Sequence, residues 1–352
     1  MICGDVHWSQ YSSIVRKRSD IYSYRLENLI QSVNWVEDLA EDQNCDLVIY
    51  LGDFFDKPDL NAEEITALQD VSWNNSDHFF LVGNHEISRA DLTYNSANTF
   101  LSRDNFSVVS FPRMVDIDRN YTMAFLPYVA EYGRKNIKTY FTETNKDIIL
   151  FSHNDIKGVQ MGVFKSTEGF GVEEIEDFCT VCFNGHLHNG GKVSKKIINV
   201  GNLTGQNFSE DAFVYKHSVV ILDTLDMSKA VFDNPFAMNF YHIDFTGKDI
   251  DYINEISMMM GKNCVATIKC DEKDFHYLRS RFNPLCREDS LPYNCNMVES
   301  KFIVNYSTNN YTDVEDNIDN TPVNHLDKFK SYMLEKYDHS DALIAELQEV
   351  CK

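Results

Sequence analysis

The sequence lacks any run of about 18 apolar residues, so we expect no segment that spans a membrane. It also lacks a positively charged start followed by an apolar stretch, and we therefore expect no signal peptide and a cytoplasmic protein. Positive charge is scarce, because 32 Lys and Arg stand against 54 Asp and Glu, which gives a formal net charge of −22. Such a chain is not expected to coat nucleic acid through a basic surface, although a local site could still neutralise phosphate.

Two tight basic clusters, Arg16–Arg18 and Lys192–Lys196, interrupt this acidic background. Each is either an ordinary solvated surface or a contact for a phosphate backbone. The nine cysteines are odd in number and scattered, which is typical of reduced, structural thiols. Cys179 and Cys182 have the spacing of a redox pair, but they lie in an apolar strand pattern, and we expect them to serve packing.

The first 225 or so residues alternate apolar runs with helical patterns, which predicts an α/β fold. Strands are expected at 47–51, 79–82, 148–151 and 181–183, and helices at 26–39 and 61–71. Further strands at 121–126, 196–200 and 218–222 are expected to complete a second sheet. Ligands of such folds bind at the carboxyl ends of the strands.

After Asp223 the pattern changes, and a second, smaller domain is expected. Residues 227–239 are predicted to be a connection, followed by a β-α-β-α unit at 240–245, 249–260, 264–270 and 272–282. Residues 305–323 have the polar composition of a linker, and two short amphipathic helices are expected at 326–337 and 340–350. The predicted domains are therefore 1–225, 240–304 and a helical module at 324–352.

Five short polar phrases follow the apolar runs of the first domain. They are Gly4-Asp5-Val6-His7, Gly52-Asp53-Phe54-Phe55-Asp56, Gly83-Asn84-His85-Glu86, Phe151-Ser152-His153 and Gly185-His186-Leu187-His188. One Asp or His at a strand end is usually structural, but five such phrases in this order indicate a metal site. Mixed oxygen and nitrogen ligands suit two divalent ions that clamp the oxygens of a phosphate.

This order of motifs resembles the calcineurin-like metallophosphoesterase superfamily, with its D-x-H, G-D-x-x-D, G-N-H-[DE], H and G-H-x-H phrases. The resemblance implies a four-layer α/β/β/α sandwich of two mixed sheets with a small α+β capping domain. It implies one metal bound by Asp5, His7, Asp53 and His188 and a second by Asp53, Asn84, His153 and His186, with a metal-bound hydroxide as nucleophile. His85 would be a catalytic residue that faces the phosphate, and Glu86 would either orient the His85 ring or be a solvated carboxylate.

Two features depart from the family pattern. Only Met1-Ile2-Cys3 precede the first phrase, so the first strand is expected to be short. Trp8 stands where the family commonly has glycine, and it either narrows the mouth of the site or offers a ring on which a base or partner stacks. Trp8 is therefore a candidate substrate-binding residue.

The second motif continues into Lys57-Pro58, without the Arg-Gly of the Ser/Thr protein phosphatases. It looks like that of the SbcD-type DNA nucleases of recombination and repair, including phage-encoded forms. The resemblance implies a metal-dependent DNA exonuclease or endonuclease that favours Mn²⁺, with Mg²⁺ possible, and Asn202 near the site as a substrate-binding residue. It also implies an SbcC-type ATPase partner docked on the C-terminal helices, and a homodimer. Residues 26–39 are a candidate dimer surface, although their apolar face could instead pack in the core.

Three other functions fit parts of the pattern. A small-molecule or cyclic-nucleotide phosphodiesterase of the same superfamily would need no capping domain. A protein phosphatase would need the missing Arg-Gly. A non-catalytic scaffold would tolerate missing ligands, and none of the expected ligands is missing from the sequence.

Overall fold

The computed structural model describes residues 1–12, 15, 21–89, 91–161, 164–249, 251–282 and 296–305. The chain divides into two compact units, Met1–Tyr306 and Ser307–Lys352, and every described residue belongs to the first. Of the sequence-based expectations, the linker beyond Asn305, the two C-terminal helices and the cluster Arg16–Arg18 lie outside the described residues.

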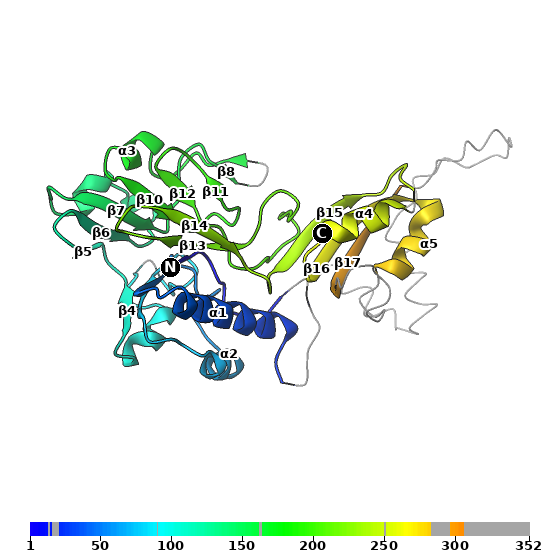
Figure 1. Ribbon diagram of the computed structural model, residues 1–352, viewed down its shortest axis with the longest axis horizontal. Helices are drawn as coiled ribbons and strands as arrows, with labels where there is room; N and C mark the ends of the chain where they lie inside the picture. The colour runs from blue at the N-terminus through cyan, green and yellow to red at the C-terminus, as the bar shows by residue number, and fades with distance from the viewer. Residues whose placement is uncertain are drawn as a thin grey trace, which may run out of the picture. The chain divides into compact units, whose positions relative to one another are not determined.

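The first sheet has six strands in the order β14-β13-β1-β2-β3-β4. Its strands β14, β13 and β4 are labelled in Figure 1. Their bounds are β14 Lys229–Asp233, β13 Ser218–Leu222, β1 Ile2–Cys3, β2 Leu47–Tyr50, β3 Asp77–Leu81 and β4 Phe106–Val109. The first strand is as short as expected, and Ile2 pairs with Ile49 on one side and Val220 on the other. Strands β1, β2, β3 and β4 run parallel, so their carboxyl ends share one edge.

The second sheet has six strands in the order β11-β12-β10-β7-β6-β5. Their bounds are β11 Gly191–Lys192, β12 Ile197–Asn199, β10 Val181–Asn184, β7 Asp147–Ser152, β6 Tyr121–Leu126 and β5 Arg113–Asp116. Its four central strands are parallel and its two edge strands antiparallel. A separate two-stranded ribbon joins β8 Gln160–Met161 and β9 Phe164–Lys165.

The two sheets pack face to face, and helices cover their outer faces. The apolar layer between the sheets takes side chains from both, among them Ile49, Phe79, Phe125 and Phe183. Helix α1 (Tyr24–Asp42) and the buried Ala67 of α2 (Ala62–Ala67) belong to the cluster on the first sheet. Helix α3 (Val172–Glu176) packs through Ile175 on the second. The fold is therefore the expected four-layer α/β/β/α sandwich of two mixed sheets.

Local sequence explains where the helices begin. Ser23 is the N-cap of α1, and its side chain accepts a hydrogen bond from the Leu26 amide. Asn61 and Glu64 form a reciprocal capping box at the start of α2. Every third or fourth residue of α1 is fully buried against the first sheet, so its apolar face serves the core rather than a partner surface.

A third sheet, in the order β15-β16-β17, follows the sandwich. It comprises β15 Met238–Asp244, β16 Asn263–Asp271 and β17 Asn296–Asn305, with α4 Asp251–Met259 and α5 Glu272–Arg281 between them. The four predicted elements of this region are confirmed, whereas β17 was not expected from the sequence. Four short 3₁₀ helices complete the described elements, η1 Leu68–Asp70, η2 Ser96–Ser102, η3 Glu131–Gly133 and η4 Ile137–Tyr140.

Two expectations about the sheets are wrong. Ser218–Leu222 pairs with β1 in the first sheet instead of joining the second. The expected connection at 227–239 contains β14, which pairs with β13 over five residues. The sequence hides this strand because β14 lies at a sheet edge, where its side chains are mostly exposed and the apolar pattern of a buried strand is absent.

Cys179 and Cys182 are buried free thiols, as expected for packing residues. Burial raises the pKa of the Cys179 thiol to about 12, which leaves little thiolate for redox chemistry. Within the described ranges, none of the helices has the length and apolar character that crossing a bilayer requires.

Candidate metal centre

The five polar phrases each follow a strand and converge at the carboxyl edge of the two sheets. The loops after β1, β2 and β3 come from the first sheet, and those after β7 and β10 come from the second. Asp5, His7, Asp53 and His153 are almost fully buried at this edge. His186 and His188 keep 14% and 27% of their side chains exposed, which leaves an open side for a substrate.

The side chains gather into two groups that correspond to the two predicted ligand sets, except that Asp53 lies in the second group and not in the first. Asp5, His7 and His188 each place a ligand atom within 4.8 Å of the others, and so do Asp53, His153 and His186. Asn84 belongs with the second group, because its Oδ1 lies 3.2 Å from Nε2 of His153. Segments as far apart in sequence as Asp5 and His188 thus meet at one site.

The tautomer of His153 leaves a lone pair that faces two oxygen acceptors. Nδ1 of His153 lies 2.8 Å from the Leu51 carbonyl oxygen, which can only accept, so Nδ1 carries a proton. In the neutral ring Nε2 is then a lone pair, yet it faces Oδ2 of Asp53 at 3.1 Å as well as the Asn84 oxygen. Only a cation or a proton between these atoms makes the arrangement stable.

The first group poses the same problem. Nδ1 of His7 lies 3.0 Å from a carboxylate oxygen of Asp56, and Nε2 of His7 faces Nε2 of His188 at 3.1 Å. The buried Oδ2 of Asp5 has no hydrogen-bond partner among the described residues. Two nitrogens aimed at each other beside an unsatisfied carboxylate oxygen fit a divalent cation.

Charge in the second group is balanced by a proton in the metal-free protein. Burial lowers the pKa of His153, but the surrounding carboxylates, Asp53 first and then Asp5 and Glu86, together raise that pKa to about 9. The contact with His153 holds the pKa of Asp53 far below its usual range against the effect of burial. A bound metal would take the place of this proton.

Three predicted ligands have unusual backbone conformations. His7, Asp53 and His186 have φ angles of 51°, 46° and 71°, in the left-handed region that residues other than glycine rarely adopt. Such conformations persist where the surroundings over-determine them, and they cluster at functional sites. These conformations therefore occur at three of the seven predicted ligands.

Glycines make room for the ligands. A Cβ atom at Gly83 would lie 2.2 Å from Oδ1 of Asp53, and one at Gly185 would lie 2.7 Å from Oδ1 of Asp5. These two glycines serve close approach of side chains. Gly52 has φ 104°, so it alone of the three glycines also needs the conformational freedom of a turn.

Glu86 takes neither of the two roles expected from the sequence, which were orientation of the His85 ring and a solvated carboxylate. It is fully buried rather than solvated, and its carboxylate accepts hydrogen bonds from the amides of Gly83, Asp53 and Phe55. The described hydrogen bonds of the His85 ring go instead to the Asp56 carbonyl, at 3.0 Å from Nδ1. Glu86 therefore holds two ligand-bearing loops together.

Asp56 is a site residue that the sequence-based list missed. One of its oxygens lies 3.0 Å from Nδ1 of His7 and 3.6 Å from Nδ1 of His85, and the three side chains form a further cluster of potential ligands. Although burial opposes its charged form, the His7 ring lowers the pKa of Asp56. Its position as the second Asp of the G-D-x-x-D phrase was the available signal.

Two other carboxylates contact the ligand histidines from outside. Oδ1 of Asp155 lies 3.2 Å from Nε2 of His186, and Oε1 of Glu210 lies 3.6 Å from Nδ1 of His188. Asp155 stands two residues after His153, which could have drawn attention to it. Glu210 follows no motif, and only the folded loop at 202–210 brings it to the site.

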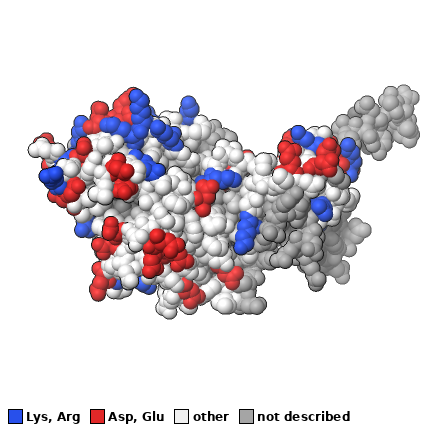
Figure 2. All heavy atoms as spheres, in the orientation of Figure 1, with Lys and Arg blue, Asp and Glu red and all other residues white. Residues whose placement is uncertain are grey.

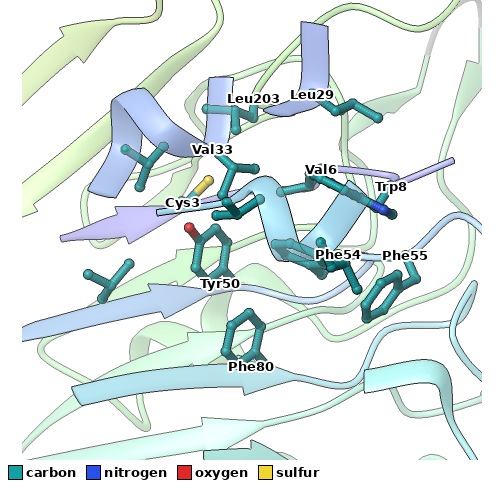
Figure 3. Close-up of a cluster of buried hydrophobic side chains, with 14 of the residues drawn as sticks. Cys3, Val6, Trp8, Leu29, Val33, Tyr50, Phe54, Phe55, Phe80 and Leu203 are labelled. Carbon is teal, nitrogen blue, oxygen red and sulfur yellow. The ribbon is translucent and has the colours of Figure 1, made fainter. Parts of the chain in front are cut away.

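The two predicted substrate-binding residues are not open to a substrate. Trp8 is fully buried against Phe54 in the apolar cluster of Figure 3, and its Nε1 donates to the Glu64 carbonyl. A ring so enclosed offers no face for stacking. Asn202 is buried as well, because its amide group binds Glu210 and His217. Its backbone amide donates to the His188 carbonyl, so it supports the ligand loop from behind.

Arg25, in the first turn of α1, was also not predicted. Its guanidinium is buried and donates to the backbone carbonyl of Gly205 at 2.8 Å and to those of Val6 and His7 at 3.5 Å. Burial lowers the pKa of Arg25 to about 10, against the pull of Asp56 and Glu210, so the group stays cationic at neutral pH.

Comparison with known proteins agrees with this geometry. The family model described as "Calcineurin-like phosphoesterase" matches residues 1–190. The curated protein named "Putative phosphoesterase 244L", from Invertebrate iridescent virus 6, is 26% identical over 145 residues, which are 38% of this chain and 47% of that protein. The chain thus matches about half the length of this relative.

Solved structures that resemble the chain have low identity to it. One is TT1561 of Thermus thermophilus, with a TM-score of 0.38 and 12% identity over 58% of this chain and 94% of that chain. Another is a dimetal phosphatase from Danio rerio, with a TM-score of 0.37 and 12% identity over 66% of this chain and 98% of that chain.

Proposed function

Because the chain belongs to the calcineurin-like phosphoesterase family of metal-dependent phosphoester hydrolases, we propose that it is a DNA nuclease with two divalent metal ions. Asp5, His7, Asp53 and His188 would bind one ion. Asp53, Asn84, His153 and His186 would bind the other. A single observation carries this ligand assignment. Within each of the two groups, the lone pair of a histidine nitrogen faces another lone pair at 3.1–3.2 Å.

Bound metals would supply Lewis acidity and a water of lowered pKa at neutral pH. The chain's own residues supply a proton donor. His85 leaves 42% of its side chain exposed, the largest fraction among the site histidines. Since Nδ1 of His85 donates to the Asp56 carbonyl, a proton given to the leaving oxygen would come from Nε2 of the imidazolium form, which returns the ring to its neutral state.

A groove beside the His186–His188 loop supports a polyanionic substrate. It has a volume of about 370 Å³, with the buried Leu187 in its wall and Lys157, Lys192 and Asn189 along its sides. None of the described residues that line the groove is acidic, which is notable in a chain of net charge −22. Figure 2 shows that basic side chains also gather on the molecular face over α3 and β12, among acidic ones. Lysines at such a groove would position phosphates that flank the cleaved bond.

The second motif favours DNA over phosphoprotein. The protein phosphatases have an arginine at the position of Lys57, but here the Lys57 ammonium pairs with the buried Glu64 carboxylate at 2.9 Å. This cation is therefore already engaged. The third sheet, β15-β16-β17, has the place in the chain at which the SbcD-type nucleases have their capping domain, which would steer DNA.

The test compares two substrates under one set of conditions. Purified protein with Mn²⁺ is incubated with end-labelled duplex DNA and with bis-p-nitrophenyl phosphate, and with EDTA as the metal-free control. We expect metal-dependent cleavage of both. Cleavage of the small ester alone would contradict the nuclease proposal and favour a small-molecule or cyclic-nucleotide phosphodiesterase.

A paired set of variants tests the groove. Lys157→Gln with Lys192→Gln should weaken DNA binding and lower its salt dependence, while hydrolysis of the small ester stays unchanged. The control double variant, Lys138→Gln with Lys229→Gln, removes the same charge from exposed positions outside the groove. Equal losses of DNA binding in both double variants would contradict a role for the groove.

We also propose an SbcC-type ATPase as partner, docked on residues 324–352, and a homodimer. Deletion of residues 321–352 should abolish association with the ATPase and leave nuclease activity intact. A pull-down in which the truncated chain still binds the ATPase would refute the docking segment. Sedimentation at several protein concentrations would test the dimer.

A further inference from the structure

The Arg25 guanidinium is a buried cation without a buried counter-ion in contact. Its side chain is about one-twentieth exposed. Its hydrogen bonds go to three backbone carbonyls, and no salt bridge within the described part of the chain includes it. Buried charges in proteins are usually paired with an opposite charge, because desolvating a lone ion is costly. This exception calls for an anion that arrives from outside.

A cavity connects this cation to the candidate metal centre. It has a volume of about 180 Å³ and is lined by His7, Asp56, Arg25 and Gln206, with Tyr11 and Ser12 at its side. This is below the roughly 300–1,000 Å³ of pockets that enclose drug-sized ligands, so the cavity suits a compact group. It lies against the same His7 ring whose Nε2 faces His188.

The Arg25 guanidinium has N–H groups that its described hydrogen bonds do not use. Arginine carries five N–H donors, and the three carbonyl contacts of Arg25 involve only two of its nitrogens. Asp56, the one carboxylate among the described residues that line the cavity, already contacts the rings of His7 and His85. Its negative charge is therefore partly compensated, and the cavity can accept a further anion.

We propose that Arg25 is a substrate-binding residue whose guanidinium donates to an oxygen of the phosphate group in the active site. The planar fork of N–H groups matches the oxygens of a phosphate better than a point charge does. Its backbone contacts to Val6 and His7 would tie phosphate binding to the loop that carries two ligands. This inference rests on the proposed metal site, but it does not need the substrate to be DNA.

Orthophosphate is the probe of this site. With Mn²⁺ present, we would measure the KM of bis-p-nitrophenyl phosphate and the inhibition constant of orthophosphate for wild type, Arg25→Lys and Arg25→Gln. A charge-assisted hydrogen bond corresponds to about 10- to 100-fold. We therefore expect Arg25→Gln to raise both constants by that factor, and Arg25→Lys to restore part of the loss. The control, Arg119→Gln, removes an exposed arginine and should change neither constant.

If Arg25 only supported the structure of the site, its replacement would change the affinity for Mn²⁺. Mn²⁺ affinity, measured by direct titration, should be the same in wild type and both Arg25 variants. Constants for orthophosphate that stay unchanged, or that shift only in proportion to Mn²⁺ affinity, would overturn the proposal.

If both variants fail to fold, the wild-type protein still tests the role of Arg25. A crystal structure with Mn²⁺ and orthophosphate should place a phosphate oxygen within hydrogen-bond distance of Arg25, and phosphate bound away from Arg25 would overturn the proposal. Failure of the nuclease proposal is distinguishable, because absence of DNA cleavage leaves the small-ester and orthophosphate measurements unaffected. Absence of all metal-dependent hydrolysis would refute the proposed function, and the phosphate position would still test Arg25.

Discussion

An oxygen of the Asp56 carboxylate lies 3.0 Å from Nδ1 of His7, and this contact determines which nitrogen of the ring can bind a metal. A carboxylate only accepts, so Nδ1 carries the proton and Nε2 keeps its lone pair. Carboxylates that hold ligand histidines in this way also increase the basicity of the ring. Asp56 thus acts on the centre without being one of the predicted ligands.

We expect Asp56→Asn to weaken metal binding by about 10- to 100-fold, the usual effect of removing such a partner. The amide can present its NH₂ to the ring and select the wrong tautomer. Titration with Mn²⁺ would measure the change. The control is Asp59→Asn, which removes an exposed carboxylate three residues along the same loop. Equal affinities in the wild type and the Asp56 variant would contradict the role given to this contact.

Gly83→Ala should disturb the geometry of the centre while every ligand residue stays the same. The new methyl group would lie 2.2 Å from Oδ1 of Asp53, so that carboxylate has to move. Displacement of about 1 Å can cost roughly 100-fold in rate. Gly133→Ala is the matched control, since nothing lies within 4 Å of a Cβ there. Initial rates on bis-p-nitrophenyl phosphate would compare them, and similar rates would show that Asp53 tolerates the shift.

Metal affinity should rise with pH between about 7 and 9. The surrounding carboxylates, Asp53 first, raise the pKa of His153 to about 9, against the effect of burial, so the ring is protonated at neutral pH in the metal-free protein. A metal binds only the deprotonated ring, and binding must therefore release a proton. Below the pKa, affinity at this site should rise by up to about tenfold per pH unit. Calorimetry in buffers of different ionisation enthalpy would count the protons, and no release at pH 7 would contradict the prediction.

The stability of the first sheet depends on a buried charged cluster away from the site. Glu37 of α1 contacts Nε2 of His78 at 2.8 Å and accepts from the Tyr50 hydroxyl at 2.7 Å, and all three side chains are buried. Removing His78 leaves the Glu37 carboxylate buried without its counter-charge, which costs about 3–5 kcal/mol. His78→Ala should therefore lower the free energy of unfolding in urea by that amount. Asp38→Asn, at an exposed position of the same helix, should change it by less than about 0.5 kcal/mol.

Sequence alone determined which side chains are the candidate ligands of the centre. Each phrase follows an apolar strand and begins or ends at polar turn residues. The apolar strand pattern and the motifs together therefore placed seven side chains at one sheet edge. Six of those side chains form two clusters and Asn84 contacts His153, although their role as ligands stays a prediction. The alternation of strands and helices predicted an α/β fold, and the family resemblance implied the four-layer architecture, which is confirmed.

Tertiary structure decided what surrounds the ligands. Trp8 follows the first phrase directly, yet its large apolar ring gains more from the cluster with Phe54 than from the solvent-facing mouth. Glu86 stands next to His85 in sequence, but three backbone amides turn its carboxylate into the interior. Arg25 and Glu210 belong to no motif, because a helix and a loop distant in sequence bring them to the centre. Motif spacing records the local geometry of strand ends, whereas burial, ion pairing and the choice of tautomer depend on neighbours that only the folded chain supplies.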